Sequence, residues 1–492
     1  PDMLLSKTGK FERDMERAAS YEEWKEAAQA YDHAAGLDRW KRMDQTRSYD
    51  FLSIRRRLDR LRSLRARHDY QGLLFNLNEG IHGNMGGMGR SVLYEKAKIG
   101  TKQLIVDYVE EICEAVELLA DPGLDEISYE EKLDFFRRAD HCFGRSALMM
   151  SGSGMLLYFH VGGVKALWEQ GLLPEILSGS SGGSFVGSVL ATHTDKELKK
   201  IFDPAYLAHE IEHGSGLIGT FNRLRPQILE VDEIRELVER FVPDMTFLES
   251  YQKTGRWMNV SIAPAETHQT SRLLNATTSP NVLMREAIMA SAAVPGVYPP
   301  VTLAARNKWG EKHEYLPLRK WVDGSVSDDM PAKRLARLYG VNHYIVSQTN
   351  PHVIPFVTDA KRSNNPLSIV RSAATRTARE WLNAGAAIMH KPLSRRPKIN
   401  QWTTMVLSIL NQDYVGDINI LPPFRMRNLT KLLAHLPEEE IMELIQMGER
   451  ATWPKIEMIR IQTRISRTLG RVRAEYELQS SPKVAIGKTR RG

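Results

Sequence analysis

Cysteine is scarce in this chain of 492 residues, which has only Cys113 and Cys142. Two cysteines cannot form a disulfide framework, and no Cys-x-x-Cys pair indicates a zinc site. We therefore expect reduced thiols, a cytoplasmic location and no metal ion.

Long apolar runs are also missing. The longest candidate, residues 155–164, contains a histidine and two glycines. It is shorter than the roughly 18 residues that a membrane-spanning helix needs. The N-terminal segment lacks the apolar centre of a signal peptide. These absences predict a protein that is soluble or lies on a membrane without crossing it.

Charge of one sign is in only mild excess, with a net charge of +7 and a pI near 9.1. Such an excess favours an anionic membrane surface or a nucleic acid without choosing between them. Arginines dominate residues 55–67, but Leu58, Leu61 and Leu64 are interleaved with them. Because no nucleic-acid-reading motif occurs, we expect no nucleic-acid partner. The arginines form either a solvated helix face or a contact with lipid headgroups or phosphate.

The periodicity of apolar residues divides the chain. Residues 1–145 are predicted to be a helical N-terminal domain, and residues 146–360 alternate short apolar runs with helical patterns. Such alternation predicts an α/β fold with a mostly parallel sheet. Residues 361–475 are predicted to be a helical C-terminal region. Residues 476–492 are basic and predicted to be disordered.

The clearest chemical motif is Gly-Ser-Ser-Gly-Gly at residues 179–183, between an apolar run and a helical pattern. A serine on a tight strand-to-helix turn needs neighbours without side chains, and Gly179 and Gly183 satisfy this need. The hydroxyl of Ser181 would then lie at a helix N-terminus, whose dipole favours developing negative charge. A glycine-serine loop without chemistry is the alternative.

Two further motifs carry polar groups. Ser-Gly-Ser-Gly at residues 151–154 follows an apolar run and precedes a predicted helix at 158–170, so its N–H groups can bind an anion. A nucleotide site is disfavoured because Leu157 stands where GxGxxG has its third glycine. Asp323, in Trp-Val-Asp-Gly-Ser, ends an apolar run and is either a turn residue or a base that takes a proton from Ser181.

A Ser-His-Asp triad would need a histidine after the acid. The histidines available by order are His343, His352, His390 and His435, and His352 has the best setting. None lies in a glycine-bounded loop, so a Ser-Asp dyad is favoured. His160 is expected to pack or cap its helix.

The order and separation of the three motifs resemble the patatin-like phospholipase family, and more specifically its triacylglycerol lipase branch. The stretches HVGGVKALWEQGLLPEILSGSSGGS and WVDGSVSDDMPAKRLARLYGVNHYIVSQTNP carry the resemblance, and YEEWKEAA resembles the helical domain that precedes the core in that branch. The resemblance implies a three-layer α/β/α patatin-like core flanked by helical N- and C-terminal regions.

The resemblance also implies roles for residues. Ser181 matches the nucleophile and Asp323 the base, while Gly152, Ser153 and Gly154 match the oxyanion-hole loop, joined by Gly182. Ser153 and Leu157 replace family glycines, and Ser325 stands where glycine or alanine is commoner.

The implied activity is hydrolysis of triacylglycerol or phospholipid esters through an acyl-enzyme, without a cofactor, at a membrane or lipid-droplet surface. A lysophospholipid acyltransferase using the same site and a non-catalytic lipid-binding protein are the alternatives. Two segments stay open: residues 290–301 form a buried strand and turn or an acyl-chain wall, and residues 369–391 form an interfacial or a packed helix.

Overall fold

The structure of the protein is a computed structural model that describes residues 2–203, 205–207, 209, 230–266, 270–325, 330–349, 416–423 and 436–480. The chain divides into two compact units. The first unit comprises Pro1–Ala18, Lys25–Arg145 and Glu457–Gly492, and the second comprises Ala19–Trp24 and Ser146–Ile456. Residues 361–475, predicted as one C-terminal region, are thus shared between the units. Every helix in the described part of the chain is too short or too polar to span a membrane.

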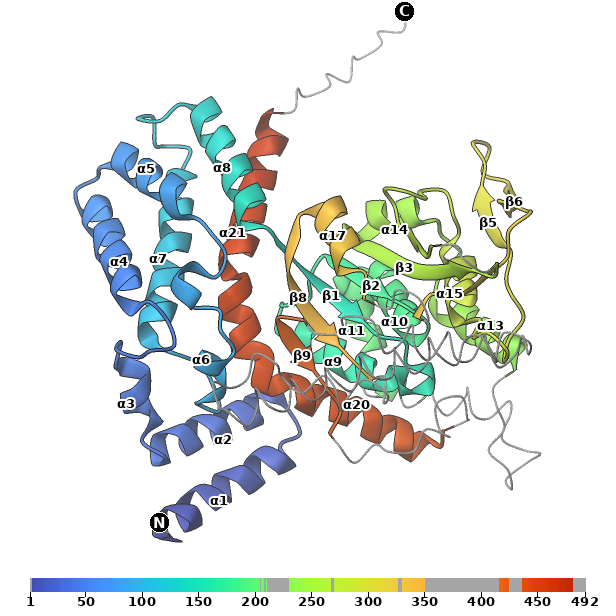
Figure 1. Cartoon of the computed structure of the whole chain (residues 1–492), viewed down its shortest axis with the longest axis horizontal. Helices are drawn as coiled ribbons and strands as arrows, with labels where there is room; N and C mark the ends of the chain where they lie inside the picture. Colours follow the sequence, from blue (N-terminus) through green and yellow to red (C-terminus); the bar gives the residue numbers. More distant parts are fainter. Residues whose placement is uncertain are drawn as a thin grey trace, which may run out of the picture. The chain divides into compact units, whose positions relative to one another are not determined.

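Helices build the first unit (Figure 1). Apolar residues at helical spacing form its core, for example Ile54, Leu58 and Leu61 of α4, which are buried. Aromatic rings add to this core, because Tyr129 and Phe136 of α8 contact the ring of Tyr476 of α21. The helices are α1 (Asp2–Arg17), most of α2 (Tyr21–Ala34), α3 (Leu37–Arg42), α4 (Phe51–Ala66), α5 (Tyr70–Gly80), α6 (Val92–Glu95), α7 (Gln103–Leu119), α8 (Tyr129–Phe143) and α21 (Ile456–Ser480).

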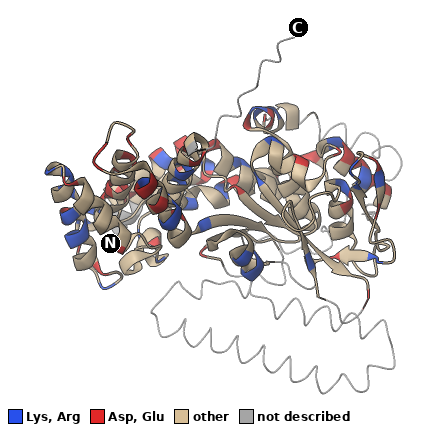
Figure 2. Ribbon diagram, turned by 90° about the horizontal axis from the view of Figure 1, so that it is seen from above, with Lys and Arg blue, Asp and Glu red and all other residues tan. Residues whose placement is uncertain are grey.

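The arginine-rich stretch is helix α4, and several of its arginines have partners inside the unit. Arg65 forms ion pairs with Glu111 and Glu114 at 2.7 and 2.6 Å. Arg57 donates a hydrogen bond to the hydroxyl of Tyr108 at 3.1 Å. Basic and acidic positions are interspersed along the helices of the chain (Figure 2). These arginines therefore belong to a mixed-charge surface in contact with α7.

A twisted, mostly parallel sheet forms the centre of the second unit, in the order β4-β3-β2-β1-β8-β9. The β1–β2, β2–β3 and β8–β9 pairs are parallel, whereas β4 and β7 run antiparallel to β3. The strands are β1 (Arg145–Met150), β2 (Ile176–Gly179), β3 (Trp257–Pro264), β4 (Arg272–Leu274), β7 (Trp321–Asp323), β8 (Val341–Ser347) and β9 (Ile418–Ile420). A separate hairpin pairs β5 (Leu303–Arg306) with β6 (Lys312–Tyr315).

Helices cover both faces of this sheet. Successive strand residues point to opposite faces, and β1 shows both environments. Met149 belongs to a core with Leu335 of α17 (Ala332–Tyr339). Met150 instead approaches Gly187 of α10 (Gly182–Thr192). The predicted three-layer α/β/α core with a mostly parallel sheet and helical flanking regions is confirmed.

Two helices of the second unit meet at backbone contact (Figure 1). A Cβ atom added to Gly162 of α9 (Leu157–Glu169) would lie 1.8 Å from the carbonyl oxygen of Ile445 in α20 (Glu438–Thr452). A Cβ on Gly448 of α20 would lie 2.1 Å from the Phe159 oxygen. Lys165 forms an ion pair with Glu449 across the same contact. Helix α9 is therefore locked in position at the point where it follows the 151–154 loop.

The prediction for residues 290–301 is wrong in part. Residues 290–292 end helix α15 (Met284–Ala292), and a turn follows, whereas a strand and turn were expected. Small residues such as Ala287 and Ala290 are fully buried there, so close packing favours a helix over the strand suggested by the apolar run. The predicted amphipathic stretch 369–391 lies outside the described residues.

Candidate active site

Ser181 occupies a strained turn between strand β2 and helix α10. Its backbone has φ 47° and ψ −125°, a conformation that side-chain-bearing residues rarely adopt. Such a conformation costs on the order of 1–3 kcal/mol and persists only where the surroundings impose it. The serine is mostly buried, with 9% of its surface exposed, at the N-terminus of α10.

The flanking glycines explain how the chain makes this turn. A Cβ added to Gly179 would lie 2.3 Å from the carbonyl oxygen of Gly183. A Cβ added to Gly183 would lie 2.5 Å from the carbonyl oxygen of Met150, at the end of β1. Because no side chain fits at either position, the spacing of glycines on both sides of Ser181 is a steric requirement.

Strand β3 brings Asp323 to this turn. Val260 of β3 pairs with Gly179 of β2 and, on the opposite edge, with Leu274 of β4. Ile262 pairs with Arg272 of β4 and with Asp323 of β7, so β7 lies on the same edge of β3 as β2. The two attachment points are two residues apart along β3, or roughly 7 Å. Asp323 therefore lies just beyond the end of β2, where the chain turns into Ser181.

The Asp323 carboxyl is buried, with 3% of the residue exposed. Burial raises the pKa of Asp323 to about 6, while hydrogen bonds from Ser325 and the nearby side chain of Ser181 lower it. The Ser325 N–H donates to Asp323 Oδ1 at 2.8 Å. The Asp323 N–H donates to the carbonyl of Ala293 at 3.0 Å. The structure thus places the two predicted catalytic residues next to each other, at the end of β2.

The 151–154 loop lies against the residue that follows Ser181. A Cβ on Gly182 would lie 2.2 Å from Ser153 Oγ, 2.8 Å from the Gly154 oxygen and 3.0 Å from Leu157 Cβ. Ser153 and Leu157, the two residues that replace glycines of the family motif, therefore both pack against Gly182. Within the described residues, the N–H groups of Ser153, Gly154 and Gly182 donate no hydrogen bond to protein. Such N–H groups can bind a negatively charged oxygen.

His160 supports this loop from behind. Its ring nitrogens lie 2.7 Å from Ser347 Oγ and 3.1 Å from the Ser151 carbonyl oxygen. The side chain is fully buried, and burial lowers its pKa to about 4. The ring is therefore neutral at pH 7. It holds the ends of β1 and β8 together, in agreement with the packing role predicted for it.

Sequence reasoning missed Ser291. The Ser181 N–H donates to Ser291 Oγ at 2.8 Å, and Ser291 Oγ donates to the Ser261 carbonyl at 2.8 Å. This hydroxyl therefore ties the strained turn to β3, the strand that also carries β7. The sequence feature that could have revealed Ser291 is a lone serine within an alanine-rich apolar stretch, because a buried hydroxyl needs hydrogen-bond partners.

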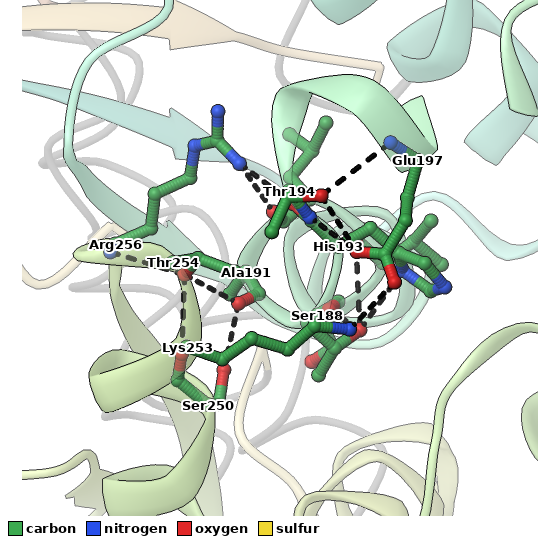
Figure 3. Close-up of polar contacts among 12 residues, drawn as sticks. Ser188, Ala191, His193, Thr194, Glu197, Ser250, Lys253, Thr254 and Arg256 are labelled. Carbon is green, nitrogen blue, oxygen red and sulfur yellow. Dashed lines mark hydrogen bonds and ion pairs between the residues drawn. The ribbon is translucent and has the colours of Figure 1, made fainter. Parts of the chain in front are cut away.

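The far end of helix α10 is held by the segment that leads into β3 (Figure 3). Arg256 donates to the carbonyls of Leu190 and His193 at 3.0 and 2.8 Å. Ser250 Oγ, in α14 (Phe247–Thr254), donates to the Ala191 carbonyl at 2.8 Å. These donors satisfy carbonyls that have no partner inside a helix, and a cation is favourable at this end of the helix dipole. The helix that carries Ser181 is thus fixed at both ends.

A second set of contacts lies next to the C-terminal end of α10, around Glu197 (Figure 3). The Thr194 N–H donates to Glu197 at 2.7 Å in a capping box that starts α11 (Asp195–Ile201). Lys253 donates to the other carboxylate oxygen at 2.9 Å. The Lys253 hydrogen bond is the largest of the interactions that lower the pKa of Glu197 to about 2.

Of the four histidines considered for a triad, only His343 is among the described residues, and it does not lie next to Ser181. His343 Nδ1 lies 2.9 Å from Ser146 Oγ, near the start of β1 and at the opposite end of the strand from the 151–154 loop. His352, His390 and His435 lie outside the described residues.

Comparison with known families matches both parts of the chain. Residues 148–336 match the model of patatin-like phospholipases. Residues 4–141 match a domain of unknown function designated DUF3336. The crystal structure of VipD from Legionella pneumophila is similar over 65% of this chain and 67% of that chain, with a TM-score of 0.30 and 13% identity.

Fungal proteins are similar over most of the chain. A patatin-like phospholipase domain-containing protein of Aspergillus niger is 32% identical over 92% of this chain and 64% of its own length. One from Aspergillus fumigatus is 32% identical over 93% of this chain and 68% of its own length. The chain thus spans a little under two thirds of the Aspergillus niger relative. Together with the match to the family model, these relatives show that the chain belongs to the patatin-like phospholipase family.

Proposed function

We propose that the protein is a serine acyl-ester hydrolase that cleaves triacylglycerol or phospholipid esters, with Ser181 as nucleophile and Asp323 as base. The observation that carries the proposal is the placement of the buried Asp323 carboxyl beside Ser181, which follows from the pairing of β2 and β7 along one edge of β3. It occurs at a turn whose strained backbone presents a serine at a helix N-terminus. A nucleophile next to a base is the arrangement that covalent catalysis needs.

The first half of the reaction forms an acyl-enzyme. Ser181 Oγ attacks the ester carbonyl carbon while its proton passes to the Asp323 carboxylate. The tetrahedral intermediate then collapses, the bond to the alcohol oxygen breaks, and Asp323 returns the proton to that oxygen. In the second half, water attacks the acyl carbon, Asp323 takes the water proton and returns it to Ser181, and the fatty acid leaves. Because Asp323 is buried, its basicity is raised for this task.

The oxyanion is assigned to the backbone N–H groups of the 152–154 loop and of Gly182. Gly152 belongs to the same loop, and a Cβ at its position would lie 3.0 Å from Ser325 Cβ, beside the base. The N-terminus of α10 adds a favourable dipole. Loss of one oxyanion donor typically lowers kcat by about 100-fold or more. The mechanism uses no cofactor.

One observation favours a second candidate, a non-catalytic lipid-binding protein. The Ser153 side chain packs against Gly182, where the matching family position has only a hydrogen. If this hydroxyl narrows the oxyanion site, the fold can still bind lipid without turning it over. An acyltransferase that uses the same residues differs only in the acceptor, an alcohol in place of water.

The test is fluorophosphonate labelling with peptide mapping, combined with hydrolysis of a series of p-nitrophenyl esters. Wild type should be labelled at Ser181 and turn over esters, and Ser181→Ala should lose both. Ser178→Ala is the matched control, because Ser178 Oγ is buried on β2 without a hydrogen-bond partner among the described residues. Full activity of Ser181→Ala would overturn the assignment.

Absence of labelling and turnover in folded wild-type protein would favour the lipid-binding candidate. Addition of a lysophospholipid acceptor separates the remaining possibilities. Release of free fatty acid supports the hydrolase, whereas transfer of the acyl group to the acceptor supports the acyltransferase.

A further inference from the structure

The exposed large apolar side chains of the second unit are concentrated in one short segment. Among the described residues of this unit they are Val297, Trp309, Leu316 and Leu318, all between positions 297 and 318. Trp309 is 73% and Leu318 is 96% exposed. A single exposed leucine needs no explanation, but four exposed large apolar residues in one segment, one of them a tryptophan, indicate an interaction surface.

The β5–β6 hairpin is labelled in Figure 1, and Trp309 belongs to the turn that joins its strands, because Arg306 pairs with Lys312. At its base, Leu303 and Ala305 of β5 are buried. The tip is an ordered turn, because Asn307 Oδ1 accepts hydrogen bonds from the N–H groups of Trp309 and Glu311 at 2.9 and 3.0 Å. The tryptophan is therefore held out from the protein by a defined turn.

A second turn follows the hairpin and presents Leu318. Leu316 has φ 52°, which is unusual for a leucine, and its carbonyl accepts a hydrogen bond from the Arg319 N–H at 2.9 Å. Strained residues of this kind are common at binding sites. The exposed Leu318 side chain thus results from a turn that the chain maintains against a backbone preference.

Basic residues flank the apolar ones in the sequence, and one of them, Lys312, is ion-paired with Glu286 at 3.0 Å. The segment 307–320 contains Lys308, Lys312, Arg319 and Lys320 against Glu311 and Glu314, so four positive and two negative charges give +2 with histidine neutral. Lys308 Nζ lies 4.4 Å from the centre of the Trp309 ring. Lys308 and Lys320 form no ion pair with another described residue. An aromatic ring beside uncompensated lysines is suited to the boundary between anionic headgroups and acyl chains.

The same segment leads directly into the site. Val301 pairs with Trp321, two residues before Asp323. On the other side of Val297, the Ala293 carbonyl accepts the hydrogen bond of the Asp323 N–H. The apolar segment is therefore connected at both ends to the backbone that positions the base.

We propose that the segment 297–320, with Trp309 and Leu318 as its inserted side chains, docks the protein on an anionic lipid surface. This inference rests on the proposed function, because a lipid-ester hydrolase must reach substrate held in an interface. Trp309 and Leu318 enter the acyl boundary, while Lys308 and Lys320 contact lipid phosphates. Ester groups at the surface are then brought close to Ser181.

The test is flotation of the whole chain with vesicles of phosphatidylcholine, with and without phosphatidylserine. We expect wild type to bind the vesicles that contain phosphatidylserine, and binding to weaken as salt is added. Trp309→Ala/Leu318→Ser should reduce the partition coefficient by about tenfold or more. Lys308→Ala should reduce it by about fivefold on anionic vesicles only.

Phe75→Ser is the matched control, because Phe75 is 62% exposed in the first unit. Its partition coefficient should equal that of wild type. The docking variants should also retain hydrolysis of a soluble p-nitrophenyl ester, since neither side chain touches the site. The inference would be overturned if wild-type protein did not bind the vesicles that contain phosphatidylserine, or if the docking variants bound them as strongly as wild type. If Ser181 proves unreactive while the docking variants lose vesicle binding, the proposed function fails and the docking surface stands.

Discussion

Replacing Asp323 with asparagine should stabilise the second unit at neutral pH while removing its activity. The buried carboxyl has a folded-state pKa near 6, above its ordinary value of 3.8. A raised carboxyl pKa means that the folded state holds the proton more tightly than the unfolded chain. The contribution of Asp323 to stability is therefore fully present below pH 3.8 and is lost as the pH rises through 6.

The difference between the folded and unfolded pKa values of Asp323 gives the size of the effect on the free energy of unfolding. At about 1.36 kcal/mol for each pH unit, ionising Asp323 in the folded protein costs about 3 kcal/mol. Asparagine is close in shape and carries no charge, so the Asp323→Asn variant does not incur this cost. The free energy of unfolding of the variant minus that of wild type should therefore rise by about 3 kcal/mol between about pH 3 and about pH 7.

The assay is urea unfolding followed by tryptophan fluorescence over this pH range. Of the seven tryptophans among the described residues, all except Trp40 lie in the second unit, so their signal reports on that unit. Subtracting the wild-type curve removes the titration of every other group, including His160. A difference that is constant with pH, or that falls as pH rises, would refute the argument. The same variant should lose turnover, because asparagine cannot accept the Ser181 proton.

Three further perturbations test the surroundings of the site. Ser325→Ala removes a hydrogen bond that favours the charged form of Asp323, so the acidic limb of the kcat/KM–pH profile should move about one pH unit upward, and an unchanged limb would contradict this. Burial lowers the folded-state pKa of His160 to about 4, so the contribution of His160 to folding stability is present above pH 6.5 and is lost as the pH falls to about 4. His160→Gln should therefore remove about 3 kcal/mol of the acid-dependent loss of stability measured by urea unfolding. A pH dependence equal to that of wild type would disprove this prediction. Gly182→Ala places a Cβ 2.2 Å from Ser153 Oγ and should lower kcat by at least about 100-fold on p-nitrophenyl esters, whereas near-normal turnover would show that the 152–154 loop is not part of the oxyanion site.

Much of the local structure is predictable from the sequence because its causes are local. The apolar periodicity of residues 101–120 predicts a helix, and α7 (Gln103–Leu119) is that helix. The apolar run WMNVSIAP predicts a strand, and β3 covers the same residues. The turn at Ser181 is encoded by Gly179 and Gly183, since the space available to each glycine is set by neighbours a few residues away or by the adjacent strand.

Other features are set by contacts between distant segments. The apolar run at residues 290–292 is compatible with either strand or helix, and burial of its small residues in close packing decides for α15. The partners of Ser291, at Ser181 and Ser261, lie 110 and 30 residues away in the chain. The sequence shows that a buried serine needs partners, but not which ones.

The site itself shows the same division. From the sequence alone, Ser181 is a nucleophile candidate with a steric rationale, and Asp323 is an acidic residue at the end of an apolar run, equally consistent with a turn. The tertiary structure makes them a pair, because β3 holds the end of β2 and the end of β7 on one edge, two residues apart. That pairing also buries the carboxyl, and the burial changes its pKa. A carboxylate's proton affinity depends on what surrounds it in space, so only the folded chain determines it.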